Sequence, residues 1–314
     1  MKKNKTFTTF CLKSLLLVVI IFGVDRLTGA TFVKMKDIGL AHNPENMWLK
    51  TPFTVEKVNA NVVVIGSSRA SHHYVPQMLE DSLGMTAYNC GQDGCFFLYQ
   101  NCIVNMVLDR YQPKIIIWDI QPSSFTTKGL KEYQNIRYLS PYYPNSHWAK
   151  EYIDNESAKM PYRMMSRMFA YNSKALNYIF PLVFHTSSTQ KGYIPLPIDG
   201  YKYPEKSTDI DTTSLGMNRK YLNLLSETLL RCREQGVTLV LCISPTFAQN
   251  KLGMDNIESA LGRVATYNGA CFINSSNDAI FTENAMLFKD FDHLNAKGAR
   301  LYTAKVIKEI TELK

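Results

Sequence analysis

Short apolar runs recur along this chain, and stretches with helical spacing separate them. Such runs, rich in Val and Ile, suit strands that are buried on both faces. Strands that alternate with helices predict a parallel sheet with helices on both faces, which is a three-layer α/β/α sandwich. The predicted strands are residues 61–65, 86–89, 114–120, 237–243 and 270–273, and the predicted helices are 75–83, 98–110, 215–235, 255–267 and 295–313.

Residues 125–214 break this rhythm between the third and fourth strands. We predict an insertion here that lies over one edge of the sheet. Two interpretations of its aromatic side chains remain open, because they can stack on sugar rings or fill a small core of the insertion itself. These aromatic residues are Tyr133, Tyr138, Tyr142, Tyr143, Trp148, Tyr152, Tyr162, Tyr171 and Tyr178.

The N-terminal segment has a basic tip followed by an apolar run over residues 7–24, which Asp25 and Arg26 end. Residues 1–30 are either an uncleaved signal anchor or a secretory signal peptide cut near Ala30. Both interpretations place the rest of the chain outside the cytoplasm, at a membrane surface or secreted, because basic flanks stay inside. We predict a connector at 31–60, broken by prolines, and one α/β domain at 61–314.

Composition excludes several classes of function. The 314 residues are 46% hydrophobic and 20% charged, which fits a globular core, and the formal net charge is +8. No nucleic-acid-binding signature accompanies that charge, so we expect no nucleic-acid partner. The seven cysteines include no CxxC pair, and Asp290 with Asp292 offers too few ligands, so we predict neither a metal nor a cofactor. A disulfide between Cys90 and Cys95 remains an alternative outside the cytosol.

Candidate reactive side chains follow the strands, because ligands of open parallel sheets bind outside the carboxyl ends of the strands. Gly66-Ser67-Ser68-Arg69 follows the first strand, where a hydroxyl can be exposed beside a helix start or can cap that helix. The glycines between Asn89 and Gly94 follow the second strand and allow a substrate to approach the backbone closely.

The segment after the fifth strand supplies a base. Asp290 stands three residues before His293, just before the last predicted helix. A nucleophile needs a base, and the base needs an acceptor that orients it. We therefore predict that one of the two serines, His293 and Asp290 form a catalytic set.

These three segments together resemble the SGNH (GDSL-like) hydrolase superfamily over residues 60–312, and the ending from Asp290 to Ala299 is the most specific part. The Gly-Ser-Ser start is similar to that of membrane-anchored members that modify cell-envelope polymers. The resemblance implies a flavodoxin-like fold, Ser68 as nucleophile, and Asp290 and His293 as its partners. It also implies that the Ser68 and Gly94 amides stabilise the oxyanion.

One block departs from the family pattern. The family carries an asparagine after the third strand, whereas this chain has Asp119-Ile120-Gln121-Pro122-Ser123. Ser123 or Gln121 is the candidate replacement donor, and Arg69 is a candidate contact for an acidic substrate. The expected function is hydrolysis of an O-acyl ester on a carbohydrate or cell-envelope substrate. The alternatives are acyl transfer to an envelope polysaccharide and a catalytically silent polysaccharide-binding protein.

Overall fold

The computed structural model describes residues 2–127, 135–172, 174–184, 189–198, 216–247 and 254–312. Its centre is a five-stranded sheet in the order β2-β1-β3-β4-β5, and every neighbouring pair is parallel. The predicted three-layer α/β sandwich is thereby confirmed. The strands are β1 (Val62–Ile65), β2 (Ala87–Asn89), β3 (Ile115–Asp119), β4 (Thr238–Ile243) and β5 (Cys271–Asn274).

Successive side chains of the strands enter different cores, as the two-residue period of a strand requires. Val63, Ile116 and Leu241 belong to the larger core, whereas Val62, Ile115 and Val240 belong to the smaller one. The larger core is covered by α2 (Lys50–Glu56), α5 (Phe97–Arg110), α10 (Arg219–Glu234) and α11 (Asp255–Tyr267). The smaller core is covered by α3 (Ser68–His73), α4 (Pro76–Leu83), α12 (Ala279–Thr282) and α13 (Ala296–Glu312).

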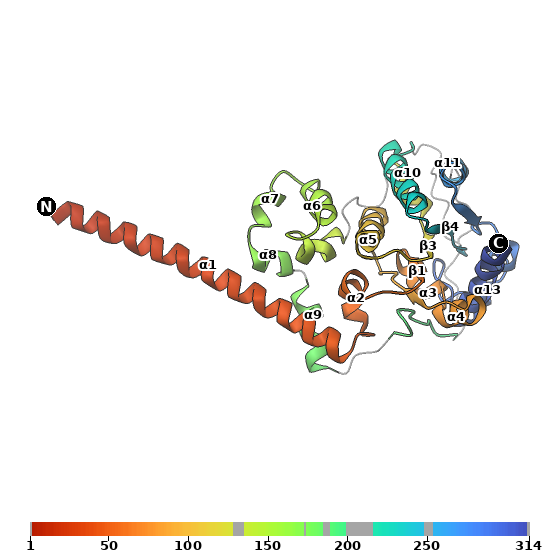
Figure 1. The fold of residues 1–314 in the computed structure, drawn as a ribbon, viewed down its shortest axis with the longest axis horizontal. Coiled ribbons are helices and arrows are strands. Elements are labelled where there is room, and N and C mark those ends of the chain that lie inside the picture. Colours follow the sequence, from red (N-terminus) through yellow and green to blue (C-terminus); the bar gives the residue numbers. More distant parts are fainter. Residues whose placement is uncertain are drawn as a thin grey trace.

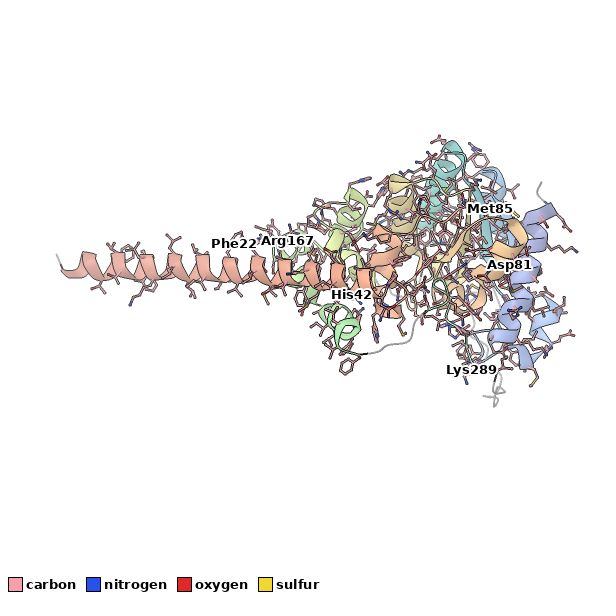
Figure 2. All side chains as sticks on the ribbon, turned by 60° about the horizontal axis from the view of Figure 1, so that its bottom comes forward. Phe22, His42, Asp81, Met85, Arg167 and Lys289 are labelled. Atoms are coloured by element: carbon pink, nitrogen blue, oxygen red, sulfur yellow. The ribbon has the colours of Figure 1, made fainter. Side chains whose placement is uncertain are left out.

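The N-terminal helix α1 (Lys2–His42) is longer than predicted and projects from the body (Figure 1). It continues through residues 31–42, which we had assigned to a connector, because this part packs on the body instead of forming a loop. Only after His42 does the chain turn, through a short 3₁₀ turn (Met47–Leu49), into α2. Part of α1, from Thr6 onward, is long and apolar enough to cross a membrane, and its most apolar window is fully exposed. Figure 2 shows its side chains extending free of the body as far as Phe22.

The insertion after β3 forms a small helical layer beside α1 rather than a layer over the strands (Figure 1). Tyr152, Tyr171 and Tyr178 are buried in the larger core, and Tyr138, Tyr142, Tyr143 and Trp148 pack against it. Most of the described aromatic side chains therefore pack in a core instead of lying on a surface. Tyr133 lies outside the described residues. The elements are 3₁₀ turns at Pro122–Phe125 and Ile136–Tyr142 and helices α6 (His147–Asp154), α7 (Met160–Arg163), α8 (Arg167–Asn172) and α9 (Ala175–Val183).

Cys90 and Cys95 are both buried and both free, so the structure does not contain the disulfide that the sequence left open. Burial raises the pKa of the Cys90 thiol to about 11. Both side chains belong to the larger core. They act there as small apolar groups.

Candidate active site

Ser68 is brought to the carboxyl edge of the sheet by a tight passage from β1 into α3. Gly66 fits this passage because an added Cβ would lie 2.5 Å from the Cβ of Ala70 and 2.8 Å from the carbonyl oxygen of Asp119. Ser67 then precedes the helix, and its carbonyl accepts the amide of Ser71 at 3.0 Å. Ser68 is the first helical residue and stays partly exposed, whereas Ser67 is buried.

His293 lies within hydrogen-bond distance of Ser68, although the two residues are 225 positions apart in the chain. The Ser68 hydroxyl and Nε2 of His293 are 2.8 Å apart, and Nδ1 of His293 is 2.9 Å from Oδ1 of Asp290. If Nδ1 carries the proton that Asp290 accepts, Nε2 is free to accept from Ser68. The three side chains thus have the connectivity of nucleophile, base and orienting carboxylate.

Asp290 is held in place by its own loop. Its Oδ1 accepts the backbone amides of Asp292 and His293, both at 2.9 Å, in addition to the imidazole. Burial raises the pKa of this carboxyl, but the bonds from the His293 ring and the two amides outweigh burial and hold the pKa below its ordinary value. Asp290 is therefore an anion near neutral pH and can stabilise a protonated His293.

His73 links helix α3 to the loop that carries His293. Its Nε2 accepts the backbone amide of Leu294 at 2.9 Å, and the side chain is completely buried. Burial, reinforced by the nearby His293, holds the pKa of His73 well below its usual value, so the ring is neutral and remains an acceptor. Asn295 fixes the other side of the loop, since its Oδ1 caps α13 at the amides of Lys297 and Gly298.

His72 is the site neighbour whose closeness to His293 we did not derive from sequence. Its ring stands edge-on to that of His293 with centroids 5.6 Å apart. Its Nδ1 lies 2.7 Å from the carbonyl oxygen of Ile194, and its Nε2 lies 3.4 Å from Asp93. The signal was available, because residues four apart on a helix share a face and His72 follows Ser68 by four.

Arg69 is buried and paired within the protein, in contrast to the predicted contact with an acidic substrate. The residue is 2% exposed, its guanidinium donates to the carbonyl of Ile120 at 2.8 Å, and it lies 3.5 Å from the carboxylate of Asp119. Tyr74 also donates to Asp119, at 2.6 Å. Arg69 is thus committed to the buried support beneath the site, where it joins α3 to the end of β3.

The predicted oxyanion donors lie at the ends of the neighbouring strands. Gly94 has a left-handed backbone with φ of 68°, and its carbonyl accepts from Asn135 at 2.9 Å. Gln121 and Ser123 begin the segment after β3, and Oε1 of Gln121 is buried without a partner among the described residues. The oxyanion roles of Gly94, Gln121 and Ser123 stay predictions, because such donors bond to the carbonyl oxygen of a substrate.

Lys50 is a buried charge close to this region. Its Nζ donates to the hydroxyl of Ser71 at 3.0 Å. Burial lowers the pKa of Lys50 to about 8, although Asp93, Cys90 and Glu45 act in the opposite direction. A helix residue in the predicted connector thereby reaches the α3 side of the site.

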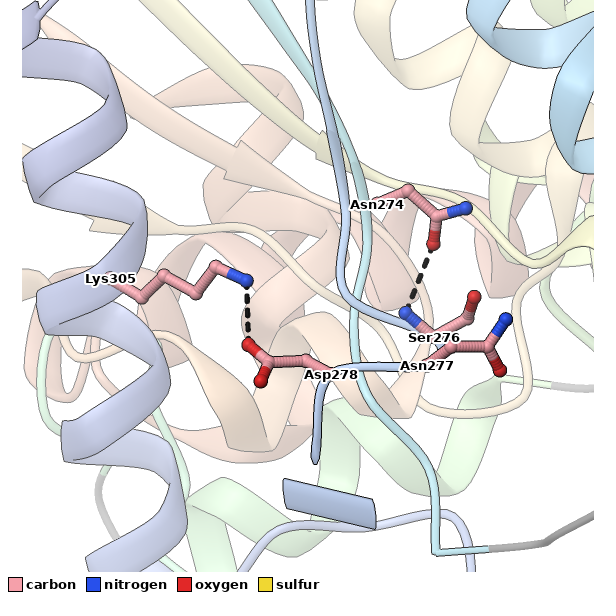
Figure 3. Close-up of a pocket in the computed structure, with 5 residues that line it drawn as sticks. All are labelled: Asn274, Ser276, Asn277, Asp278 and Lys305. Carbon is pink, nitrogen blue, oxygen red and sulfur yellow. Dashed lines mark hydrogen bonds and ion pairs between the residues drawn. The ribbon is translucent and has the colours of Figure 1, made fainter. Parts of the chain in front are cut away.

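A separate hollow of about 400 Å³ opens beyond the end of β5, the edge strand (Figure 3). Its polar lining is largely paired internally. Lys305 binds Asp278 at 2.6 Å, and Asn274 accepts the amide of Ser276 at 3.0 Å (Figure 3). None of the predicted catalytic residues lines it. The described residues also contain no cluster of three or more His, Cys, Asp or Glu side chains that could hold a metal.

Comparison with known proteins gives no family. No family model matches the sequence, and no curated protein matches it. Among solved structures, a catalytic mutant of the acetylxylan esterase Axe2 from Geobacillus stearothermophilus is similar at 11% identity, over 79% of this chain and 93% of that chain, with a TM-score of 0.42. LAE5, an α/β hydrolase enzyme from the metagenome of Lake Arreo, Spain, is similar at 11% identity over 83% and 99%, with a TM-score of 0.44. The activity of this chain must therefore be inferred from its own residues.

Proposed function

We propose that this protein is a serine esterase of the SGNH type that removes an acyl group from a carbohydrate or another cell-envelope substrate. The observation that carries the proposal is the chain of contacts from Ser68 through His293 to Asp290. Ser68 attacks the ester carbonyl while His293 takes its proton, and the acyl group becomes bonded to the serine oxygen. The alcohol leaves with the proton from His293, and water, activated by the same base, then releases the acid.

The negative charge that develops on the carbonyl oxygen needs donors. The candidates are the backbone amide of Ser68 at the start of α3, the backbone amide of Gly94 after β2, and the side chain of Gln121 after β3. A donor in this position contributes a factor of about 10²–10³ to the rate. Gln121 is a candidate side-chain donor because it is partly exposed directly after β3 and its amide nitrogen can donate to an oxyanion.

The proposal places the catalytic body outside the cytoplasm, held at the membrane by α1. The basic N-terminal tip and the exposed apolar stretch that follows support this orientation. A substrate of this site is then a polymer or glycan of the envelope rather than a cytoplasmic metabolite.

Hydrolysis of a small aryl acetate and of an acetylated oligosaccharide tests the proposal. We expect activity in the wild type and a loss of at least about 10³-fold in Ser68→Ala. Ser67→Ala is the matched control, because its hydroxyl is buried and has no described partner. Activity that survives in a folded Ser68→Ala variant sinks the proposal.

Acyl transfer is the second candidate, and the changed segment at Gln121 and Pro122 favours it. A different oxyanion group can accompany a different acceptor for the same acyl-serine. Product analysis with and without an acceptor glycan separates the two. Free acid in both reactions identifies an esterase, whereas acylated glycan with little free acid identifies a transferase.

A further inference from the structure

The insertion contains a segment of unusual charge. Residues 157–198 include no Asp or Glu, although the whole chain has 27 of them. The same segment carries five basic side chains: Lys159, Arg163, Arg167, Lys174 and Lys191. Lys191 pairs with Glu80 and Lys174 lies over the ring of Tyr138, whereas Lys159 and Arg163 are exposed. Exposed positive charge attracts partners of negative charge.

The end of this segment that is formed by α7 and the start of α8, residues 159–168, also exposes large apolar side chains. We call it the basal tip. Tyr162 is 75% exposed and Met165 is 69% exposed, and Met168 joins them. Lys159 and Arg163 are exposed beside them. Surfaces that lie at a membrane interface typically combine large apolar or aromatic side chains with Lys and Arg, and the basal tip has this combination.

The basal tip is fixed to α1 where the fully exposed part of that helix ends. Asp25 caps the tip, since its carboxylate accepts the Ser166 hydroxyl at 2.5 Å and the amides of Arg167 and Met168 at 2.9 and 3.0 Å. Arg26 donates to the carbonyl of Met165 at 3.1 Å. These contacts set the height of the tip relative to the apolar stretch before Asp25.

Gly29 allows the close approach of the two elements. A Cβ at this position would lie 2.5 Å from the Cβ of Arg167. The side chains at 6–24, in contrast, are all exposed. Figure 2 shows Phe22 on the free part of α1, with Arg167 beside the next part of the helix. The tip thus begins where the membrane-length apolar stretch stops.

We propose that the basal tip contacts the surface of an anionic lipid bilayer. The inference rests on the part of the proposed function in which α1 crosses the membrane. Lys159 and Arg163 face the lipid phosphates, while Tyr162, Met165 and Met168 enter the region between headgroups and acyl chains. The contact adds a second attachment to the one that α1 provides, and it fixes the orientation of the body.

The orientation has a consequence for the substrate. Figure 1 shows α3, α4 and α13 at the end of the body opposite the free end of α1. Ser68 begins α3, and His293 precedes α13. A body that rests on the basal tip therefore presents its catalytic site away from the bilayer, toward substrates outside the lipid.

Tryptophan fluorescence with brominated lipids tests the contact in the full-length protein in lipid nanodiscs. The variants are Met165→Trp at the tip, Phe22→Trp in the apolar stretch, and Tyr267→Trp as a control on α11, where the native side chain is 84% exposed. Each is compared with the wild type to remove the signal of the three native tryptophans. We expect the added fluorescence to be quenched by bromolipid at 22 and 165 and not at 267.

Two outcomes overturn the proposal. Quenching at 22 without quenching at 165 shows that the anchor is embedded but the tip is free of lipid, as expected if another protein covers it. Absence of quenching at 22 shows that the apolar stretch of α1 is not embedded, which excludes both the anchor and the tip contact. Labelling of Ser68 by a fluorophosphonate in the same discs reports separately whether the proposed chemistry is present.

A second experiment tests whether the basic side chains of the tip contribute to the lipid contact. The variant Met165→Trp with Lys159→Glu and Arg163→Glu should lose at least half of the bromolipid quenching in discs that contain anionic lipid. The corresponding variant with Lys220→Glu and Lys297→Glu, two lysines outside the tip, should keep it. Equal quenching in both contradicts the charge-assisted contact.

Discussion

Asp290 and His293 are three residues apart, and their contact follows from that spacing because one turn of chain can close it. The contact between Ser68 and His293 is long-range, yet the rule that loops meet at the carboxyl edge of a parallel sheet predicts it. Arg69 could not be assigned in this way. Arg69 is buried against Asp119, which lies at the end of another strand, and the residues next to Arg69 in the sequence do not indicate this contact.

Gln121 is the side chain that we propose as a donor to the oxyanion. If its amide donates to the oxyanion, Gln121→Ala should lower kcat by about 10²–10³-fold and leave KM nearly unchanged. Ester hydrolysis kinetics give both constants. Ser123→Ala is the matched variant, and a larger loss there would move the donor role to Ser123.

Lys50 makes stability depend on pH in an alkaline window. Its pKa is about 8 when folded and near its usual 10.5 when unfolded, so the unfolded chain binds more protons between these values. Stability therefore rises with pH through this window, and the charge costs about 3 kcal/mol at pH 7. Urea unfolding of the wild type and Lys50→Met should give a difference that changes in favour of the wild type from pH 8 to 10. A difference independent of pH would show that Lys50 is not titrating there.

At the scale of elements, all five strands were predicted to within a few residues. The central strands β1 and β3 are apolar runs that are buried throughout, and helical stretches delimit the edge strands β2 and β5. The residue patterns alone do not predict the strand order, whereas the flavodoxin-like fold that the resemblance implies has the order observed. The length of α1 was also missed. Its second half is helical because it packs on the insertion, for example through Phe32 against Tyr171. The local sequence pattern does not indicate that the insertion lies there.

The contact of α1 with α8 makes a prediction at this scale. Asp25→Ala removes the acceptor for the first amides of α8 and should destabilise this part of the body by about 1–2 kcal/mol. Hydrogen exchange at the amides of Arg167 and Met168 should become faster, while exchange in β1 and β3 stays unchanged. Asp25→Asn keeps an acceptor and should lie closer to the wild type. Unchanged protection in Asp25→Ala would show that the cap does not hold α8.

For the whole molecule, the packing of α1 favours the uncleaved anchor. Cleavage near Ala30 would remove Asp25, Arg26 and Gly29, which all contact the insertion. We therefore expect protein from the membrane fraction of the native host to keep its N-terminal segment, as measured by intact mass. A mature protein that begins near residue 31 would identify a secretory signal instead.

A fluorophosphonate probe tests most directly whether Ser68 is a nucleophile activated by His293. Folded wild-type protein and Ser67→Ala should each gain one probe mass, located on Ser68 by peptide mapping. Ser68→Ala should gain none, and His293→Ala should react far more slowly. Absence of labelling in folded wild-type protein, or equal labelling of Ser68→Ala, would contradict the account.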